Sequence, residues 1–155
     1  MNNQVFVGSW LVSYLVGEPP SVLTRESINP LAAEAAVSFL AGGALIAAGS
    51  PAYPVPDQAT SGDRLLVGTG CGSWAMTGEL TATVRIAALL RHEDGNAVAT
   101  VFVDATVQLD PDNDTFSGSY TVESHLSRAW TRNLPSLDGS VQGWRIGTPT
   151  GAGTA

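Results

Sequence analysis

Residues 79–110 read ELTATVRIAALLRH EDGN AVATVFVDATVQLD, and this stretch decides the fold. Two largely apolar arms, 79–92 and 97–110, flank a polar segment that contains Asp94 and Gly95. In the second arm alternate residues share an apolar face, namely Val101, Val103, Ala105, Val107 and Leu109, with Phe102 the exception on the polar face. This alternation is typical of a half-buried strand, and Asp-Gly favours a tight turn because glycine accepts a positive φ. The stretch therefore predicts a hairpin of two unusually long strands.

Similar alternation recurs on both sides of this hairpin. Residues 4–16 place Phe6, Trp10 and Tyr14 on one face, and the strand is expected to end before Pro19-Pro20. Three further strands are expected, at 71–77, 115–125 and 139–147. Residues 50–70 are rich in Pro, Gly, Ser and Asp, which predicts a long irregular loop.

Residues 31–41, LAAEAAVSFLA, can be interpreted in two ways. Their alanines and glutamate have high helix propensity. Ala41-Gly42-Gly43-Ala44, however, is a tight-turn sequence, and the run that follows it is short and apolar. We favour a hairpin of strands at 35–41 and 44–49, with a short helix near Pro30–Ala36 as the alternative.

The expected elements add up to an all-β chain of about eight antiparallel strands in meander order. A meander of this size avoids exposed edges most simply by closing into an up-and-down barrel. Alternate connections of a meander lie at the same end, so the three long ones, after the first strand, at 50–70 and at 126–138, fall together. We therefore expect a closed base with tight turns and a loop-covered open mouth. Residues 1–148 are predicted to form this single domain, with 149–155 as a flexible C-terminal tail.

Gly8-Ser9-Trp10 on the first strand resembles the Gly-x-Trp signature of lipocalins and the wider calycin group. In that group an arginine near the end of the last strand packs over the tryptophan at the closed base. The resemblance therefore implies structural roles for Trp10 and Arg145. Some small intracellular barrels with this general architecture are cyclases or pericyclases of bacterial secondary metabolism. By that likeness the substrate would be a small apolar metabolite, such as a polyketide intermediate.

The composition narrows the choice of partners. The 155 residues are 44% hydrophobic and carry a net charge of −7, with no lysine. Nucleic acid and anionic membranes are therefore not expected partners, whereas a homodimer stays open. The single cysteine, Cys71, excludes an internal disulfide, and the first ten residues lack the pattern of a signal peptide. We expect a cytoplasmic protein without a metal or other cofactor.

Two tyrosines stand out near the predicted mouth. Tyr14 shares a face with Trp10, and Tyr120 shares one with Phe116. A tyrosine offers an apolar body and one hydrogen-bonding tip, which suits the orientation of a carbonyl or hydroxyl in an apolar cavity. His125, at the mouth end of its strand, completes the set of candidate catalytic residues. The alternative is that each tyrosine is a core residue and that His125 is a solvated strand end.

Other apolar side chains are candidate ligand contacts, and Trp130 is one of them because its loop lies above the predicted mouth. The full set is Val12, Trp74, Met76, Phe102, Val122 and Trp130. The sequence carries no hydrolase elbow, P-loop or zinc-protease motif. We therefore expect a cofactor-free cyclase or isomerase that folds its substrate inside the barrel. A non-catalytic carrier barrel and a structural protein with a filled core are the alternatives.

Overall fold

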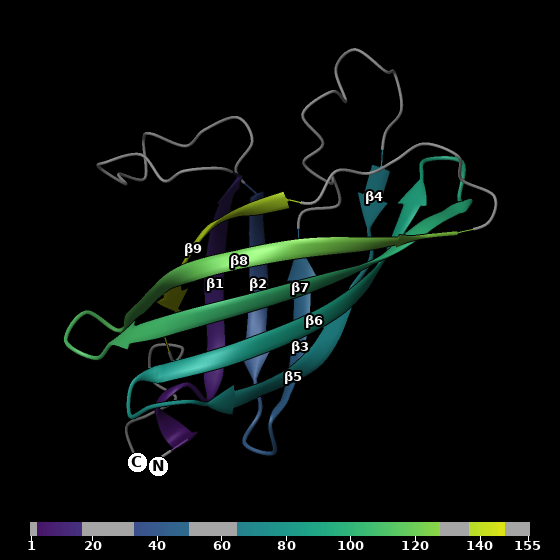
Figure 1. The fold of residues 1–155 in the computed structure, drawn as a ribbon. Coiled ribbons are helices and arrows are strands. Elements are labelled where there is room, and N and C mark those ends of the chain that lie inside the picture. Colours follow the sequence, from purple (N-terminus) through teal and green to yellow (C-terminus); the bar gives the residue numbers. More distant parts are fainter. Residues whose placement is uncertain (1–2, 17–32, 50–64, 128–136, 148–155) are drawn as a thin grey trace.

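The computed structural model describes residues 3–16, 33–49, 65–127 and 137–147, and these contain nine strands and one short 3-10 helix (Figure 1). The elements are η1 (Asn3–Val5), β1 (Gly8–Val16), β2 (Ala33–Phe39), β3 (Ala44–Gly49), β4 (Leu65–Val67), β5 (Gly70–Met76), β6 (Thr81–His92), β7 (Ala97–Asp110), β8 (Thr115–Leu126) and β9 (Leu137–Arg145). Eight of the strands, all but β4, pair antiparallel in chain order, and β9 pairs back with β1. The chain is therefore a closed all-β barrel, as predicted.

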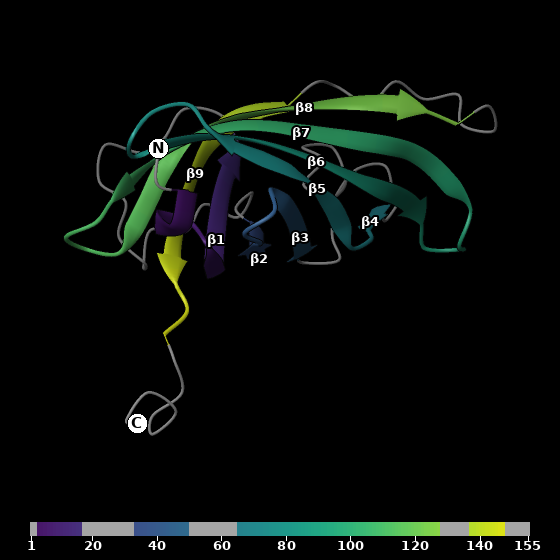
Figure 2. The same cartoon turned by 90° about the horizontal axis from the view of Figure 1, so that it is seen from below.

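The barrel has one wall of long strands and one of shorter strands. In Figure 1, β6, β7 and β8 run diagonally in front of β1, β2 and β3. Figure 2 shows the same long strands arching over the shorter ones. Strand ends alternate, so the turns after β2, β5 and β7 lie at the base. The strands β1, β3, β6 and β8 end at the mouth.

The central hairpin is formed as the sequence predicts. β6 and β7 pair from Thr81↔Gln108 to Arg91↔Ala97, with a register shift between Leu90 and Arg91. In the turn, Gly95 has a φ of 93° and its amide donates to the carbonyl of His92, at 2.9 Å. The positive φ is the conformation for which glycine is favoured at this position.

The strand predicted at 35–41 is confirmed as the first arm of a hairpin, although it runs from Ala33 to Phe39. β2 and β3 form a hairpin with Phe39 opposite Leu45 and Ala35 opposite Gly49. The loop predicted at 50–70 is wrong in part, because Leu65–Val67 form the short strand β4. β6 is longer than β5, and β4 pairs with the portion of β6 that extends beyond β5. Apolar residues at 65–67 therefore serve as a sheet extension.

The first strand begins later than the alternation indicates. Residues 3–5 form η1, and β1 starts only at Gly8, which has a φ of 133°. Such a φ is open to glycine and interrupts an extended chain. The break turns the N-terminal segment back beneath the barrel, so Phe6 enters the base.

The base is closed by a cluster of five aromatic rings, which we call the aromatic base: Phe6, Trp10, Phe39, Trp74 and Phe116. Phe6 is fully buried, and its ring centroid lies 5.9–6.5 Å from the centroids of the other four. The indole N–H groups are satisfied, because Trp10 donates to the carbonyl of Phe6 and Trp74 to that of Leu40. The predicted closed base is thus a packed aromatic layer.

Arg145, the last residue of β9, packs on the aromatic base and hydrogen-bonds the chain around it. Its guanidinium carbon lies 4.2 Å from the centroid of the Trp10 ring. Nη1 and Nη2 donate to the carbonyls of Val7 and Val5, and Nε donates to Asp114 at 2.6 Å. A Cβ on Gly8 would lie 2.9 Å from Nη1, which explains glycine in the Gly-x-Trp pattern. The expected packing of Arg145 on Trp10 is confirmed.

Candidate ligand cavity

A cavity of about 150 Å³ lies inside the barrel on the mouth side of the aromatic base. All nine described strands contribute to its lining, and the lining residues within the described ranges are aliphatic, aromatic or glycine, with no charged group. At roughly 10–15 Å³ per water in this measure, the space would hold about ten waters, or a small organic molecule. Its largely apolar lining suits an apolar molecule.

The cavity floor is the upper side of the aromatic base. Phe39 and Phe116 belong to that cluster and also line the cavity. The Phe116 ring lies over Gly143 on β9, where an added Cβ would be only 2.3 Å from the ring. The glycine therefore lets the ring lie flat on the barrel wall and leaves the space above it open.

Tyr14 and Tyr120 both line the cavity and contact each other, as the sequence analysis expected of their faces. Their ring centroids are 5.8 Å apart in an edge-to-face arrangement, and we call them the tyrosine pair. The Tyr120 hydroxyl donates to the carbonyl of Leu15 at 2.8 Å. It reaches that carbonyl across β9 at Gly139, where an added Cβ would lie 3.0 Å from the hydroxyl. Glycine at 139 therefore makes this hydrogen bond possible.

The six predicted ligand contacts separate into three groups. Val12 and Val122 line the cavity. Trp74 is buried in the aromatic base and Met76 packs against it, so both lie below the cavity rather than in its wall. Trp130 lies outside the described residues. The prediction that Trp74 and Met76 contact the ligand is therefore wrong. Both belong to the base, because their strand, β5, ends at the closed end of the barrel.

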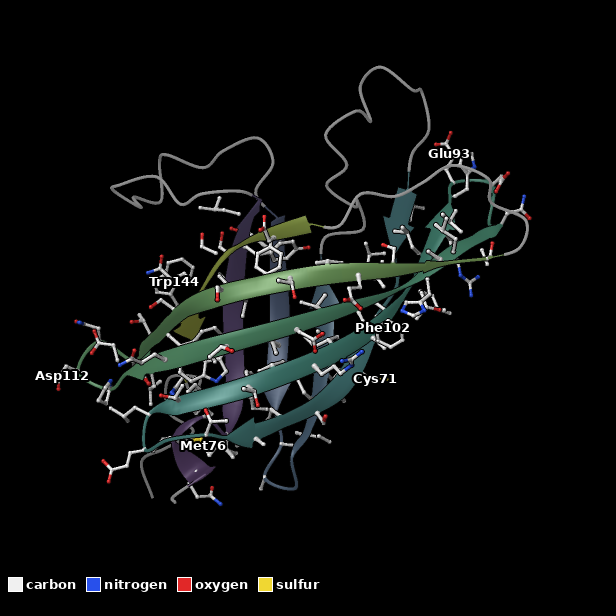
Figure 3. The ribbon with its side chains drawn as sticks, viewed as in Figure 1. Cys71, Met76, Glu93, Phe102, Asp112 and Trp144 are labelled. Carbon is white, nitrogen blue, oxygen red and sulfur yellow. The ribbon has the colours of Figure 1, made fainter. Side chains whose placement is uncertain are left out.

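Phe102 and His125 were expected to face the ligand, and this expectation is wrong. Val101 and Val103 line the cavity, so Phe102 between them points out of the barrel. Its ring contacts that of His125 at 5.1 Å between centroids, and the Arg85 guanidinium lies 5.1 Å from the Phe102 centroid. Figure 3 labels Phe102 on β7 and the exposed Cys71 on β5, and β6 lies between these two strands.

Substitution of His125 with alanine is therefore expected to leave ligand affinity and any turnover unchanged within about twofold. The imidazole is exposed and is separated from the cavity by the barrel wall. Surface substitutions of this kind usually change stability by about 0.5 kcal/mol or less. Affinity for the same probe, measured by calorimetry in both proteins, checks the expectation. A tenfold loss of affinity for the probe would show that His125 does take part in ligand binding.

Several aliphatic and glycine residues of the cavity wall are not among the predicted ligand contacts. Ala35, Ala47 and Gly49 line the cavity from β2 and β3, and Val103 and Val107 line it from β7. The signal was present, since period-two alternation placed Val103 and Val107 on the inner face of their strand. The prediction on this strand instead selected the aromatic Phe102 as the ligand contact.

Within the described ranges, no group of three or more His, Cys, Asp or Glu residues is placed to hold a metal ion. In the same part of the chain, no helix has the length and apolarity needed to cross a membrane. No family model, curated protein or solved structure matches this chain. The fold and the cavity define a closed eight-stranded antiparallel barrel, and this architecture is consistent with calycin-like folds.

Proposed function

We propose that this protein is a cofactor-free cyclase or isomerase that folds a small, largely apolar molecule inside its barrel. The observation that supports the proposal is the uncharged cavity above the aromatic base, in which the tyrosine pair supplies the polar side-chain groups. The calycin-like resemblance of the Gly-x-Trp motif and its arginine agrees with a ligand-binding barrel. Polyketide-like intermediates are the substrate class that we favour.

The catalytic contribution of such a cavity would be mainly conformational. Binding holds two reactive parts of a flexible chain together, so the entropy cost of bringing them together is met before the reaction starts. In well-oriented cases this lowers the activation barrier by about 7–11 kcal/mol. A hydroxyl that hydrogen-bonds a carbonyl adds electrostatic stabilisation where charge develops. The Tyr120 hydroxyl donates its hydrogen bond to the Leu15 carbonyl, so toward a ligand its oxygen can only accept a hydrogen bond. Tyr14 also lines the cavity, and we propose that it is the member of the tyrosine pair that contacts the polar group of the ligand.

A non-catalytic carrier is the second candidate, and the same hydrogen bond favours it. The Tyr120 hydroxyl is committed to the barrel wall, which suits a tyrosine that shapes a binding site. The lining residues that the structure describes also include no carboxylate, imidazole or thiol that would transfer a proton. Pericyclic and conformational reactions need no such group, so turnover has to be measured to separate the two functions.

Tyr14→Phe is the variant that separates them. If the cavity is catalytic, loss of the hydroxyl is expected to lower kcat by about 10²-fold, as removal of one oriented donor does elsewhere. If the cavity only binds, affinity should fall by about 0.5–1.5 kcal/mol, the worth of one hydrogen bond. Single-turnover kinetics on candidate linear polyenes or polyketides, together with calorimetric affinities, measure both effects.

Tyr120→Phe is the matched control, because it removes a hydroxyl from the other ring of the pair. This variant should also lower the melting temperature, since the Leu15 carbonyl loses its side-chain donor. If both variants keep wild-type affinity and turnover, the tyrosine pair has no part in function.

A further inference from the structure

Inward-facing side chains become smaller from base to mouth along two neighbouring strands. On β2 the inward positions run Phe39, Val37, Ala35, and on β3 they run Leu45, Ala47, Gly49. The register places these residues in three cross-strand rows, Phe39↔Leu45, Val37↔Ala47 and Ala35↔Gly49. The lower row is buried, with Phe39 in the cavity floor, whereas the upper two rows line the cavity wall.

The long-strand wall does not become smaller in this way. Its inward positions at the level of the cavity vary in size without a taper toward the mouth: Val84, Ile86 and Ala88 on β6, and Val101, Val103, Ala105 and Val107 on β7. Gly70 on β5 adds no space of its own, because Ile86 already lies 2.7 Å from the position of its missing Cβ. Short side chains on both walls leave room in the cavity, and Ala35, Ala47 and Gly49 supply it on the β2–β3 wall.

The second property of the wall is its lack of charge. Among the residues that the structure describes, every one that lines the wall is uncharged, and Tyr120, the buried member of the tyrosine pair, already donates to the protein backbone. A carboxylate, sulfonate or phosphate placed against this wall would lose its hydration without gaining a cation. The lining thus selects against charged molecules.

We propose that Ala35 and Ala47 set the size of the molecule that the cavity accepts, and that this molecule is uncharged. This inference rests on the proposed function and adds to it the ligand class and two specificity-determining residues. A larger side chain at 47 or 35 projects into the open space above Phe39. It occupies the volume that the ligand needs.

Each of these alanines has a matched control beside it. Ala48 follows Ala47 on β3 and Ala36 follows Ala35 on β2, and both controls are exposed on the outer face. Ala47→Leu and Ala48→Leu therefore add the same atoms to the same strand, on opposite sides of the barrel wall. Ala35→Leu and Ala36→Leu repeat the comparison on β2 if a variant at 47 does not fold.

The experiment uses two probes that share one skeleton, neutral 2-naphthalenemethanol and anionic 2-naphthoate, with binding measured by calorimetry. Wild-type protein is expected to bind the neutral probe at least tenfold more tightly than the anion. Ala47→Leu should weaken the neutral probe at least tenfold, whereas Ala48→Leu should stay within twofold of wild type. Because the new side chain fills a void, Ala47→Leu should melt no lower than Ala48→Leu.

Each result has a definite meaning. If wild-type protein binds the neutral probe and Ala47→Leu binds it equally well, the size assignment is wrong while the proposed binding function stands. Equal affinity for the two probes overturns the ligand class. If Ala47→Leu melts about 2–4 °C or more below Ala48→Leu, the position is already packed and the assignment fails. If wild-type protein binds neither probe, the proposed function fails together with the inference.

Discussion

Replacement of Phe6 by alanine is expected to lower the free energy of unfolding by about 3–5 kcal/mol, the usual cost of removing a buried phenylalanine. Phe6 is fully buried and contacts the four other rings of the aromatic base. The truncation leaves a cavity on the barrel axis that rings held by β1, β2, β5 and β8 cannot easily close. Urea unfolding followed by tryptophan fluorescence measures the loss.

Phe102→Ala is the control for this variant, since it removes an identical side chain from the outside of the barrel. We expect it to cost about 1 kcal/mol or less, mainly the contact with the Arg85 guanidinium. Equal losses for the two variants would show that the aromatic base does not carry the stability of the fold. An unchanged transition for Phe6→Ala would place this residue outside the core.

The fold could be predicted from the sequence largely because alternation and turn chemistry agree. In β7 the inward residues were identified one by one, and Gly95 marked the turn. Phe6 was assigned to the correct face, but its position beneath the barrel depends on the φ of Gly8, which alternation does not reveal. β4 was missed because three residues are too few to show a period.

The candidate site was harder to predict than the fold. Parity correctly placed Tyr14 and Tyr120 on inner faces, and the structure brings them into contact. Height along the barrel axis was the missing quantity: Trp74 has inward parity but lies in the base, below the cavity. Phe102 shows the opposite error, since its size suggested a ligand contact while its parity placed it outside. Side-chain type therefore predicts a ligand contact only when strand parity and height along the barrel axis agree with it.

Arg145→Ala is expected to lower the free energy of unfolding by about 2–4 kcal/mol. The side chain is partly buried, donates to the carbonyls of Val5 and Val7, and covers the Trp10 ring. A hydrogen bond from a charged donor contributes about 1.5–3 kcal/mol, and a cation on an indole about 0.5–2 kcal/mol, although such values do not add fully. Alanine leaves both carbonyls without this donor and also breaks the contact with Asp114.

Arg85→Ala is the matched control, because Arg85 also combines an aspartate partner with an aromatic ring. Its guanidinium is exposed on the outer wall beside Asp104, at 3.3 Å, and near Phe102. Exposed pairs of this kind contribute about 1 kcal/mol or less. Arg145→Ala should therefore lower the midpoint of urea unfolding well below that of Arg85→Ala.

The two ends of the barrel can be distinguished with the same variants. Arg145 packs on Trp10, and neither residue lines the cavity; Phe116, whose ring centroid lies 5.0 Å from that of Trp10, does line it. Under conditions where Arg145→Ala remains folded, its affinity for a neutral cavity ligand should therefore match that of wild-type protein within about twofold. Ala47→Leu should show the reverse pattern, with stability kept and affinity lost. If Arg145→Ala instead abolished binding at an unchanged melting temperature, the ligand site would lie at the base, and the assignment of the two ends would be reversed.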